Sequence, residues 1–279
     1  MVSKLITLKT YESIIAEQRN WADQHSIKYD KAGYVSSLKD NLYRPLFPET
    51  QNEFRKGKGE ELDGKMQALH SSSALVVNIF DYWRYLGKAD IIAQACGVLS
   101  RLTNIKFEQT YPIIHIRGTP PHLDIEFSLP RSNFISVIES KFTEPYHRHT
   151  KRVIKEKYFN IPGLWSQIPN CEHLARRIRE ESRSKTSFIY LDVPQLLKHI
   201  LGLTWSKSGT QNFEIVYLWY EKHSPEADRH RFEIQQFREL IGAEAHFRAM
   251  TYQELFQNIK RSVLADEAYM EYIGKRYFS

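Results

Sequence analysis

The sequence predicts an α/β domain in which a central mixed β-sheet is flanked by helices. Apolar residues recur at helical spacing through much of the first hundred residues, and the pattern then changes to a period of two between residues 105 and 142. Beyond residue 170, helical segments alternate with short β-branched or aromatic segments. Because these segments follow one another without a clear linker or repeat, a single domain is the simplest organisation.

The N-terminal part is predicted to be mainly helical. Apolar spacing predicts a helix over residues 5–25 and two more over residues 66–86 and 89–99. Residues 43–65 are polar and contain two prolines and three glycines, so we expect a long loop there.

Strands are predicted where β-branched and aromatic residues are bounded by turn residues. Four such segments are Ile105–Glu108, Ile113–Arg117, Leu123–Leu129 and Phe134–Phe142. Residues 130–133, Pro-Arg-Ser-Asn, predict a hairpin between the last two. Further helices are expected over residues 171–181, 194–203, 228–241 and 252–263, and further strands over residues 214–220 and 247–250. The first of these strands has a continuous apolar run, which is typical of a strand buried on both faces.

Composition and charge narrow the class of protein. The formal charge of +6 and the pI near 9.1 permit a polyanionic partner but do not identify one. Two cysteines without CxxC spacing argue against a disulfide framework and a structural zinc site. No apolar run approaches the ~20 residues that span a bilayer, and the N-terminus does not resemble a signal peptide. We therefore expect a soluble, cytoplasmic protein with no membrane partner.

Acidic residues and one lysine are concentrated on the two strands of the predicted hairpin. In a strand, residues two apart face the same side, so Asp124 and Glu126 point together, as do Glu139 and Lys141. Ile138 lies on the opposite face of its strand. The hairpin would therefore bring the two polar faces side by side.

Two carboxylates that converge among apolar residues repel each other and are costly to desolvate. A hard divalent cation relieves that cost, and Mg²⁺ typically takes one or two carboxylates together with water and phosphate oxygens. A lysine beside them can polarise the attacking water or stabilise charge on the phosphate. These are the parts needed to hydrolyse a phosphodiester. The alternative is a surface hairpin whose Asp, Glu and Lys side chains are simply solvated.

The arrangement of Asp124 and Glu139-Ser-Lys141 resembles the PD-(D/E)XK, or restriction-endonuclease-like, nuclease superfamily. Leu123 stands where the name of the superfamily has proline. The chain is also similar to a bacterial restriction-type subfamily over about residues 55–260. This similarity covers Gly59–Leu62, Ser71–Phe80, Tyr190–Leu201 and Ile215–Tyr220.

The resemblance implies a restriction-endonuclease-like core and a role for each matching residue. Asp124 and Glu139 would bind Mg²⁺, with Mn²⁺ expected to substitute, and Lys141 would be the catalytic lysine. Many members add an acidic residue from a helix to the metal site, and Glu61 is the candidate for it. Alternatively, Glu61 is a carboxylate at a helix start that interacts with the helix dipole. Gln195 is a weaker candidate, since a glutamine at a helix start needs no catalytic explanation.

Basic residues follow directly on the strand of Lys141. His147, Arg148, Lys151 and Arg152 could contact phosphates on either side of the scissile one. The alternative is a solvated basic loop. A second basic cluster, at residues 176–185, is interrupted by Glu180 and Glu181 and is expected on an exposed helix face.

Taken together, these features predict a metal-dependent DNA endonuclease, with a restriction or defence role implied by the resemblance. The chain is expected to form one nuclease domain, with a helical extension over residues 1–54, the core over 55–260 and a tail over 261–279. DNA is the expected partner, and a homodimer is compatible with cutting both strands. Two alternatives stay open: a nucleic-acid-binding protein that keeps the fold without cleaving, and a structure-specific DNA or RNA nuclease.

Overall fold

The structure is a computed structural model that describes residues 9–57, 61–98, 102–113, 115–149, 153–181, 187–262 and 265–279. Its centre is a five-stranded sheet with the strand order β1-β2-β3-β4-β5. β1, β2 and β3 form an antiparallel meander, whereas β4 runs parallel to β3 and β5 runs parallel to β4. The sheet is therefore mixed, which confirms the predicted α/β class.

The strands are β1 (Asn104–Thr110), β2 (His122–Ser128), β3 (Ile135–Lys141), β4 (Phe213–Trp219) and β5 (His246–Thr251). The helices that precede the sheet in sequence are α1 (Thr10–Gln24), α2 (Pro48–Lys56), α3 (Ser72–Tyr85) and α4 (Ala89–Ala95). The later helices are α5 (Pro169–Glu181), α6 (Val193–Ser206), α7 (Pro225–Ile241), α8 (Tyr252–Lys260) and α9 (Glu267–Tyr277).

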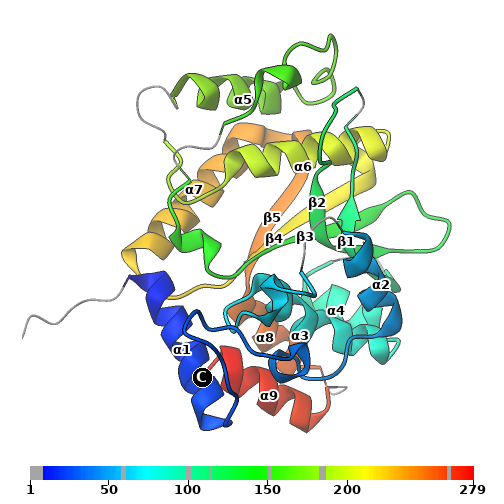
Figure 1. The fold of residues 1–279 in the computed structure, drawn as a ribbon. Helices are drawn as coiled ribbons and strands as arrows, with labels where there is room; N and C mark the ends of the chain where they lie inside the picture. Colours follow the sequence, from blue (N-terminus) through cyan, green and yellow to red (C-terminus); the bar gives the residue numbers. More distant parts are fainter. Residues whose placement is uncertain are drawn as a thin grey trace, which may run out of the picture.

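Different helices cover the two faces of the sheet. Figure 1 shows α5, α6 and α7 on one side, and α3, α4, α8 and α9 on the other. Side chains along β3 alternate between these layers. Glu139 faces α6, where His199 Nδ1 lies 3.3 Å from its carboxylate. Ser140, the next residue, faces α8, where its hydroxyl is 2.6 Å from Tyr252 Oη. Covering both faces buries the centre of the sheet, including the apolar strand β4.

α2 lies within the stretch that was expected to be a long loop, so that prediction was wrong. Pro48 occupies the first turn of this helix, where its missing N–H costs nothing. The hydroxyl of Thr50 donates to Asp81 of α3 at 2.5 Å, and Glu53 pairs with Arg84 of the same helix. These tertiary partners stabilise a short polar helix whose own sequence gives little sign of it.

The predicted strand Ile113–Arg117 was also wrong, because its described residues form no strand. The N–H of Ile116 donates instead to the carbonyl of Ile113 at 3.1 Å, which closes a turn, and His115 has a φ of +60°. A left-handed residue next to a turn interrupts the extended backbone that a strand requires.

α9 packs into the body of the domain. Its residues Tyr269, Ile273 and Tyr277 belong to the same hydrophobic cluster as the central strands. The neighbouring Arg276 is only 2% exposed, and it accepts a hydrogen bond from Gln18 of α1 at its carbonyl oxygen. Its guanidinium donates to the backbone carbonyl of Asn41 at 2.8 Å. One packed core therefore includes residues from all three predicted segments, 1–54, 55–260 and 261–279.

Candidate active site

The β2–β3 hairpin places Asp124 next to Glu139. The register of the two strands ends with Ile125 opposite Ile138, and the next position along it sets Asp124 against Glu139. Beyond that point the backbone N–H of Ser140 donates to Asp124 Oδ2 at 2.6 Å. The aspartate side chain thus continues the ladder where backbone pairing stops. Glu139 is 2% exposed, while Asp124 is partly open to solvent.

Lys141 completes the group predicted from the sequence. Its Nζ lies 2.5 Å from Glu139 Oε1, and its side chain is 12% exposed. The two residues are adjacent on one face of β3, because residues two apart in a strand point to the same side. The structure therefore brings Asp124, Glu139 and Lys141 together at one end of the hairpin.

Burial and mutual repulsion govern the ionisation of this group. Burial raises the pKa of Asp124 well above its ordinary value, and the negative charges of Glu139 and Glu108 raise it further. Burial also raises the pKa of Glu139, although Lys141 opposes that change. Burial alone would lower the pKa of Lys141, but the surrounding carboxylates outweigh it and raise that pKa. The lysine is therefore held as an ammonium ion, and the carboxylates lack enough positive charge around them.

Glu108 is an acidic neighbour that the sequence interpretation missed. It lies in β1 between the pairs Phe107–Ile125 and Gln109–Leu123, at the position opposite Asp124. Its backbone is left-handed, with a φ of +51°, which is unusual for a residue other than glycine, asparagine or aspartate. The three strands of the meander thus carry Glu108, Asp124 and Glu139 in a row. The acidic character of the segment Ile105–Glu108 was visible in the sequence, but its register with β2 was not.

His199 is a second neighbour that the sequence interpretation did not single out, since it appeared there only within the segment Tyr190–Leu201. It projects from α6 toward β3, is 3% exposed, and its Nδ1 lies 3.3 Å from Glu139 Oε2 without the geometry of a hydrogen bond. Among the described residues this nitrogen has no hydrogen-bond partner. Burial lowers the pKa of His199 well below its usual value, and the charges of Lys141 and Lys198 lower it further. The imidazole is therefore neutral beside the glutamate.

α6 is fixed in place by a buried carboxylate on α7. Glu233 is fully buried and accepts the backbone N–H groups of Ile189, Tyr190 and Leu191 at 2.8–2.9 Å. These three residues lead directly into α6, which begins with the side chain of Asp192 accepting the Gln195 N–H. The contact between α6 and the hairpin thus depends on the loop that Glu233 holds.

Other residues considered in the sequence are engaged elsewhere. Glu126 lies two residues from Asp124 on β2, and its carboxylate accepts hydrogen bonds from Lys106 and Tyr111. Glu61 pairs with Lys65 at 3.1 Å and accepts the Ser73 hydroxyl at 2.8 Å. Its role as a metal ligand stays a prediction.

The basic segment after β3 is only partly described. His147 and Arg148 are exposed, and the His147 ring lies 4.5 Å from the ring of Tyr11 in α1. Lys151 and Arg152 lie outside the described residues. In the second basic cluster, Arg176 and Arg177 form ion pairs with glutamates of the same helix, in keeping with a solvated helix face.

The chemistry of this donor set fits a hard divalent cation. Two oxygen ligands with raised pKa values stand close together, and the orphaned imidazole nitrogen of His199 lies beside one of them. Within the part of the chain that the structure describes, no three His, Cys, Asp or Glu side chains are arranged to hold a metal ion by themselves. A cation here would therefore complete its shell with water or substrate oxygens, as Mg²⁺ commonly does.

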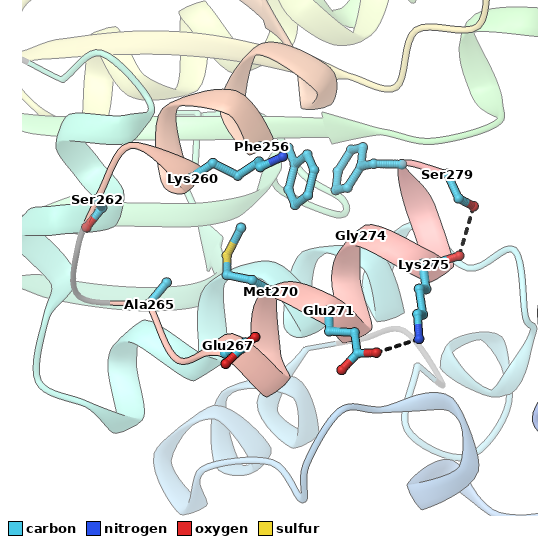
Figure 2. A pocket seen from close by; sticks show the side chains of 11 residues that line it. Phe256, Lys260, Ser262, Ala265, Glu267, Met270, Glu271, Gly274, Lys275 and Ser279 are labelled. Carbon is cyan, nitrogen blue, oxygen red and sulfur yellow. Dashed lines mark hydrogen bonds and ion pairs between the residues drawn. The ribbon is translucent and has the colours of Figure 1, made fainter.

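Away from this group, a cavity of about 700 Å³ lies between α8 and α9. Figure 2 shows Phe256, Met270 and Lys275 around it. Among the described residues that line this cavity there is none of the predicted site residues. The described residues also contain no helix long and apolar enough to cross a membrane.

Comparison with known proteins gives one family. The family model described as "Restriction Endonuclease associating with ARP" matches residues 15–278, which is nearly the whole chain. No curated protein and no solved structure gave a significant match.

Proposed function

Since the chain belongs to the family of restriction endonucleases associating with ARP, we propose that it hydrolyses phosphodiester bonds of DNA with the help of Mg²⁺. The observation that supports this most directly is the convergence of Asp124, Glu139 and Lys141 at the end of one hairpin. The family suggests a nuclease. The substrate, the metal and the role of each residue are our proposal.

The two carboxylates would hold the cation. Asp124 is partly open to solvent and can reach an incoming ion, while Glu139 lies opposite it on the neighbouring strand with its charge only partly balanced by Lys141. A bound divalent cation would polarise the scissile phosphate and lower the pKa of a water molecule beside it. Glu108, opposite Asp124, adds negative charge that favours the cation further.

Lys141 would act as a hydrogen-bond donor and a positive charge. Its pKa is raised by the carboxylates around it, so its ammonium form dominates near neutral pH. In this form it can orient the attacking water and stabilise negative charge that develops on the phosphate. It would not accept a proton while it remains paired with Glu139.

His199 would position Glu139. A neutral imidazole packed 3.3 Å from the glutamate Oε2 restricts the rotation of that carboxylate without competing for its charge.

Cleavage of supercoiled plasmid and of mixed genomic DNA, with Mg²⁺ or Mn²⁺, tests this function. Discrete fragments that disappear in Lys141→Ala would identify a sequence-specific endonuclease. A smear that disappears in the same variant would identify a less specific nuclease. Retained DNA binding without cleavage in both proteins would contradict the proposal and favour the non-cleaving alternative. Mass measurement in solution, with and without DNA, tests the homodimer.

A further inference from the structure

A second cavity, of about 250 Å³, is separated from the proposed catalytic group by the side chain of His199. It opens between α6, the segment before β2 and the short helical turn η4 (Glu156–Tyr158). His199 lines this cavity and also contacts Glu139. His122 lines it too, and stands two residues before Asp124 on the same face of β2. A ligand in the cavity would therefore lie one side chain away from the proposed catalytic group.

The walls of the cavity are rigid. Gly202 of α6 approaches the opposite wall so closely that a Cβ there would lie 2.6 Å from the Tyr111 carbonyl oxygen and 3.0 Å from Pro121 Cγ. On the third side, the carbonyl of Tyr158 accepts the Trp165 indole N–H at 2.7 Å. The cavity thus exists before any ligand binds, which reduces the entropy cost of binding.

The lining combines a flat apolar surface with polar groups at one side. Pro120, Pro121 and the buried ring of Tyr158 supply the apolar surface. Gln195 supplies an amide that can donate and accept hydrogen bonds, and Lys198 supplies positive charge. An aromatic or proline face with an amide at its edge suits a nucleobase, and the lysine suits the attached phosphate.

The size of the cavity limits the ligand. Pockets for drug-sized molecules usually measure about 300–1,000 Å³, so a cavity slightly smaller than that range holds a single planar group. A base pair within a duplex cannot enter such a space. A base can enter only when it is unpaired or has left the stack.

We propose that this cavity binds the unpaired base of one nucleotide next to the scissile phosphodiester, with Gln195 at the base edge and Lys198 at its phosphate. This inference rests on the proposed nuclease function and specifies its substrate. The preferred DNA is single-stranded, or unpaired at the cleavage site.

The test measures DNA binding separately from cleavage. Single-stranded and duplex oligonucleotides of the same sequence carry 2-aminopurine at one position at a time, and both are titrated with the full-length protein in Ca²⁺. Cleavage is measured in parallel with Mg²⁺. Gln195→Ala is compared with Gln235→Ala, a matched exposed glutamine of α7 that bonds only to Glu239 among the described residues. Tyr158→Leu removes the aromatic wall.

We expect the wild-type protein to bind the single strand about tenfold more tightly than the duplex, as stacking and one amide contact would allow. The fluorescence of 2-aminopurine should change at one position near the cut. Gln195→Ala and Tyr158→Leu should remove most of the preference for the single strand, while Gln235→Ala retains it.

Equal affinity of the wild-type protein for both DNAs would overturn the proposal, and so would equal losses for both DNAs in Gln195→Ala. The absence of a fluorescence change at every position would overturn it as well. An intact single-strand preference without any cleavage in Mg²⁺ would contradict only the nuclease function. Failure to bind either DNA would overturn both.

Discussion

The carboxylate of Asp124 accepts the backbone N–H of Ser140 at 2.6 Å, at the point where the backbone pairing of β2 with β3 ends. One oxygen of Asp124 is thereby fixed by the partner strand, and the other is left for a ligand. A functional side chain held by main-chain geometry needs little reorganisation before it acts. Changes to Asp124 should therefore alter stability and metal binding together.

Replacement of Lys141 by alanine is expected to lower the rate of DNA cleavage by about 10²–10⁴-fold. The ammonium group lies 2.5 Å from Glu139 and is the positive charge of the proposed group. DNA affinity should change little, which filter binding can measure. Lys275→Ala, at an exposed lysine paired with Glu271 on α9, serves as the control and should cleave normally.

Replacement of Asp124 by asparagine is expected to stabilise the metal-free protein near neutral pH. Burial and neighbouring carboxylates raise the pKa of Asp124, so the folded state binds more protons than the unfolded state. Its contribution to the free energy of unfolding therefore falls as pH rises above the ordinary carboxyl pKa of about 4. Removing the charge should add about 1 kcal/mol, or about 2–4 °C in Tm, for a domain of this size.

The pH dependence distinguishes this cause from a general packing effect. The stability difference between Asp124→Asn and wild type should shrink as pH falls and vanish below about pH 3, where the carboxyl group of Asp124 is protonated in both the folded and the unfolded state. Addition of Mn²⁺ should raise the Tm of the wild-type protein and leave that of the variant almost unchanged. A constant difference at every pH would show that the charge of Asp124 is not its origin.

Glu108 and Glu61 offer a comparison between the acid that the structure places near the site and the acid predicted from the sequence. Glu108→Gln should weaken Mn²⁺ binding by about fivefold, because the negative charge of Glu108 opposite Asp124 should contribute about 1 kcal/mol to the binding free energy of the cation. Glu61→Gln should have a smaller effect, since Lys65 and Ser73 engage its carboxylate. Isothermal titration calorimetry measures both, and the reverse order would favour Glu61 as the ligand.

Arg148→Ala is expected to weaken DNA binding without changing the rate of cleavage at saturation. Arg148 is exposed in the segment that follows β3, where it could contact one phosphate. The slope of log affinity against log salt concentration should fall by about 1. An unchanged slope would place this residue in a solvated loop that does not meet DNA.

Glu233→Gln is expected to destabilise the fold by about 2–4 kcal/mol, because the buried carboxylate accepts three backbone N–H groups. Urea unfolding measures this as a lower midpoint with an unchanged m-value. The control is Glu239→Gln on the same helix, whose side chain bonds to the exposed Gln235. Similar midpoints for the two variants would rule out the assigned role of Glu233.

The hairpin and its three catalytic candidates could be predicted from sequence because both depend on short-range patterns. Alternation along β2 and β3 sets which side chains share a face, and the turn at residues 130–133 sets which strands pair. Asp124, Glu139 and Lys141 lie within 18 positions of one another, so local geometry brings them together.

The rest of the site depends on distant contacts that no local pattern specifies. His199 reaches Glu139 only because α6 docks on the sheet, and that docking depends on Glu233 of α7. The position of Glu108 beside Asp124 depends on how β1 pairs with β2, and Glu108 itself has a left-handed backbone that the sequence does not indicate. α2 is stabilised by side chains of α3 and by contacts with β1, so its own polar sequence predicted a loop.

The burial of Arg276 also determines when the fold can be completed. Gln18 and Arg276 are separated by 258 positions, and the last helix supplies the groups that hold the first. A chain emerging from the ribosome cannot form this contact until α9 has been synthesised, and contacts of such sequence separation form late in folding. The docking of α1 is therefore completed only after α9 has left the ribosome, although α1 also packs against earlier residues such as Val35 and Leu69.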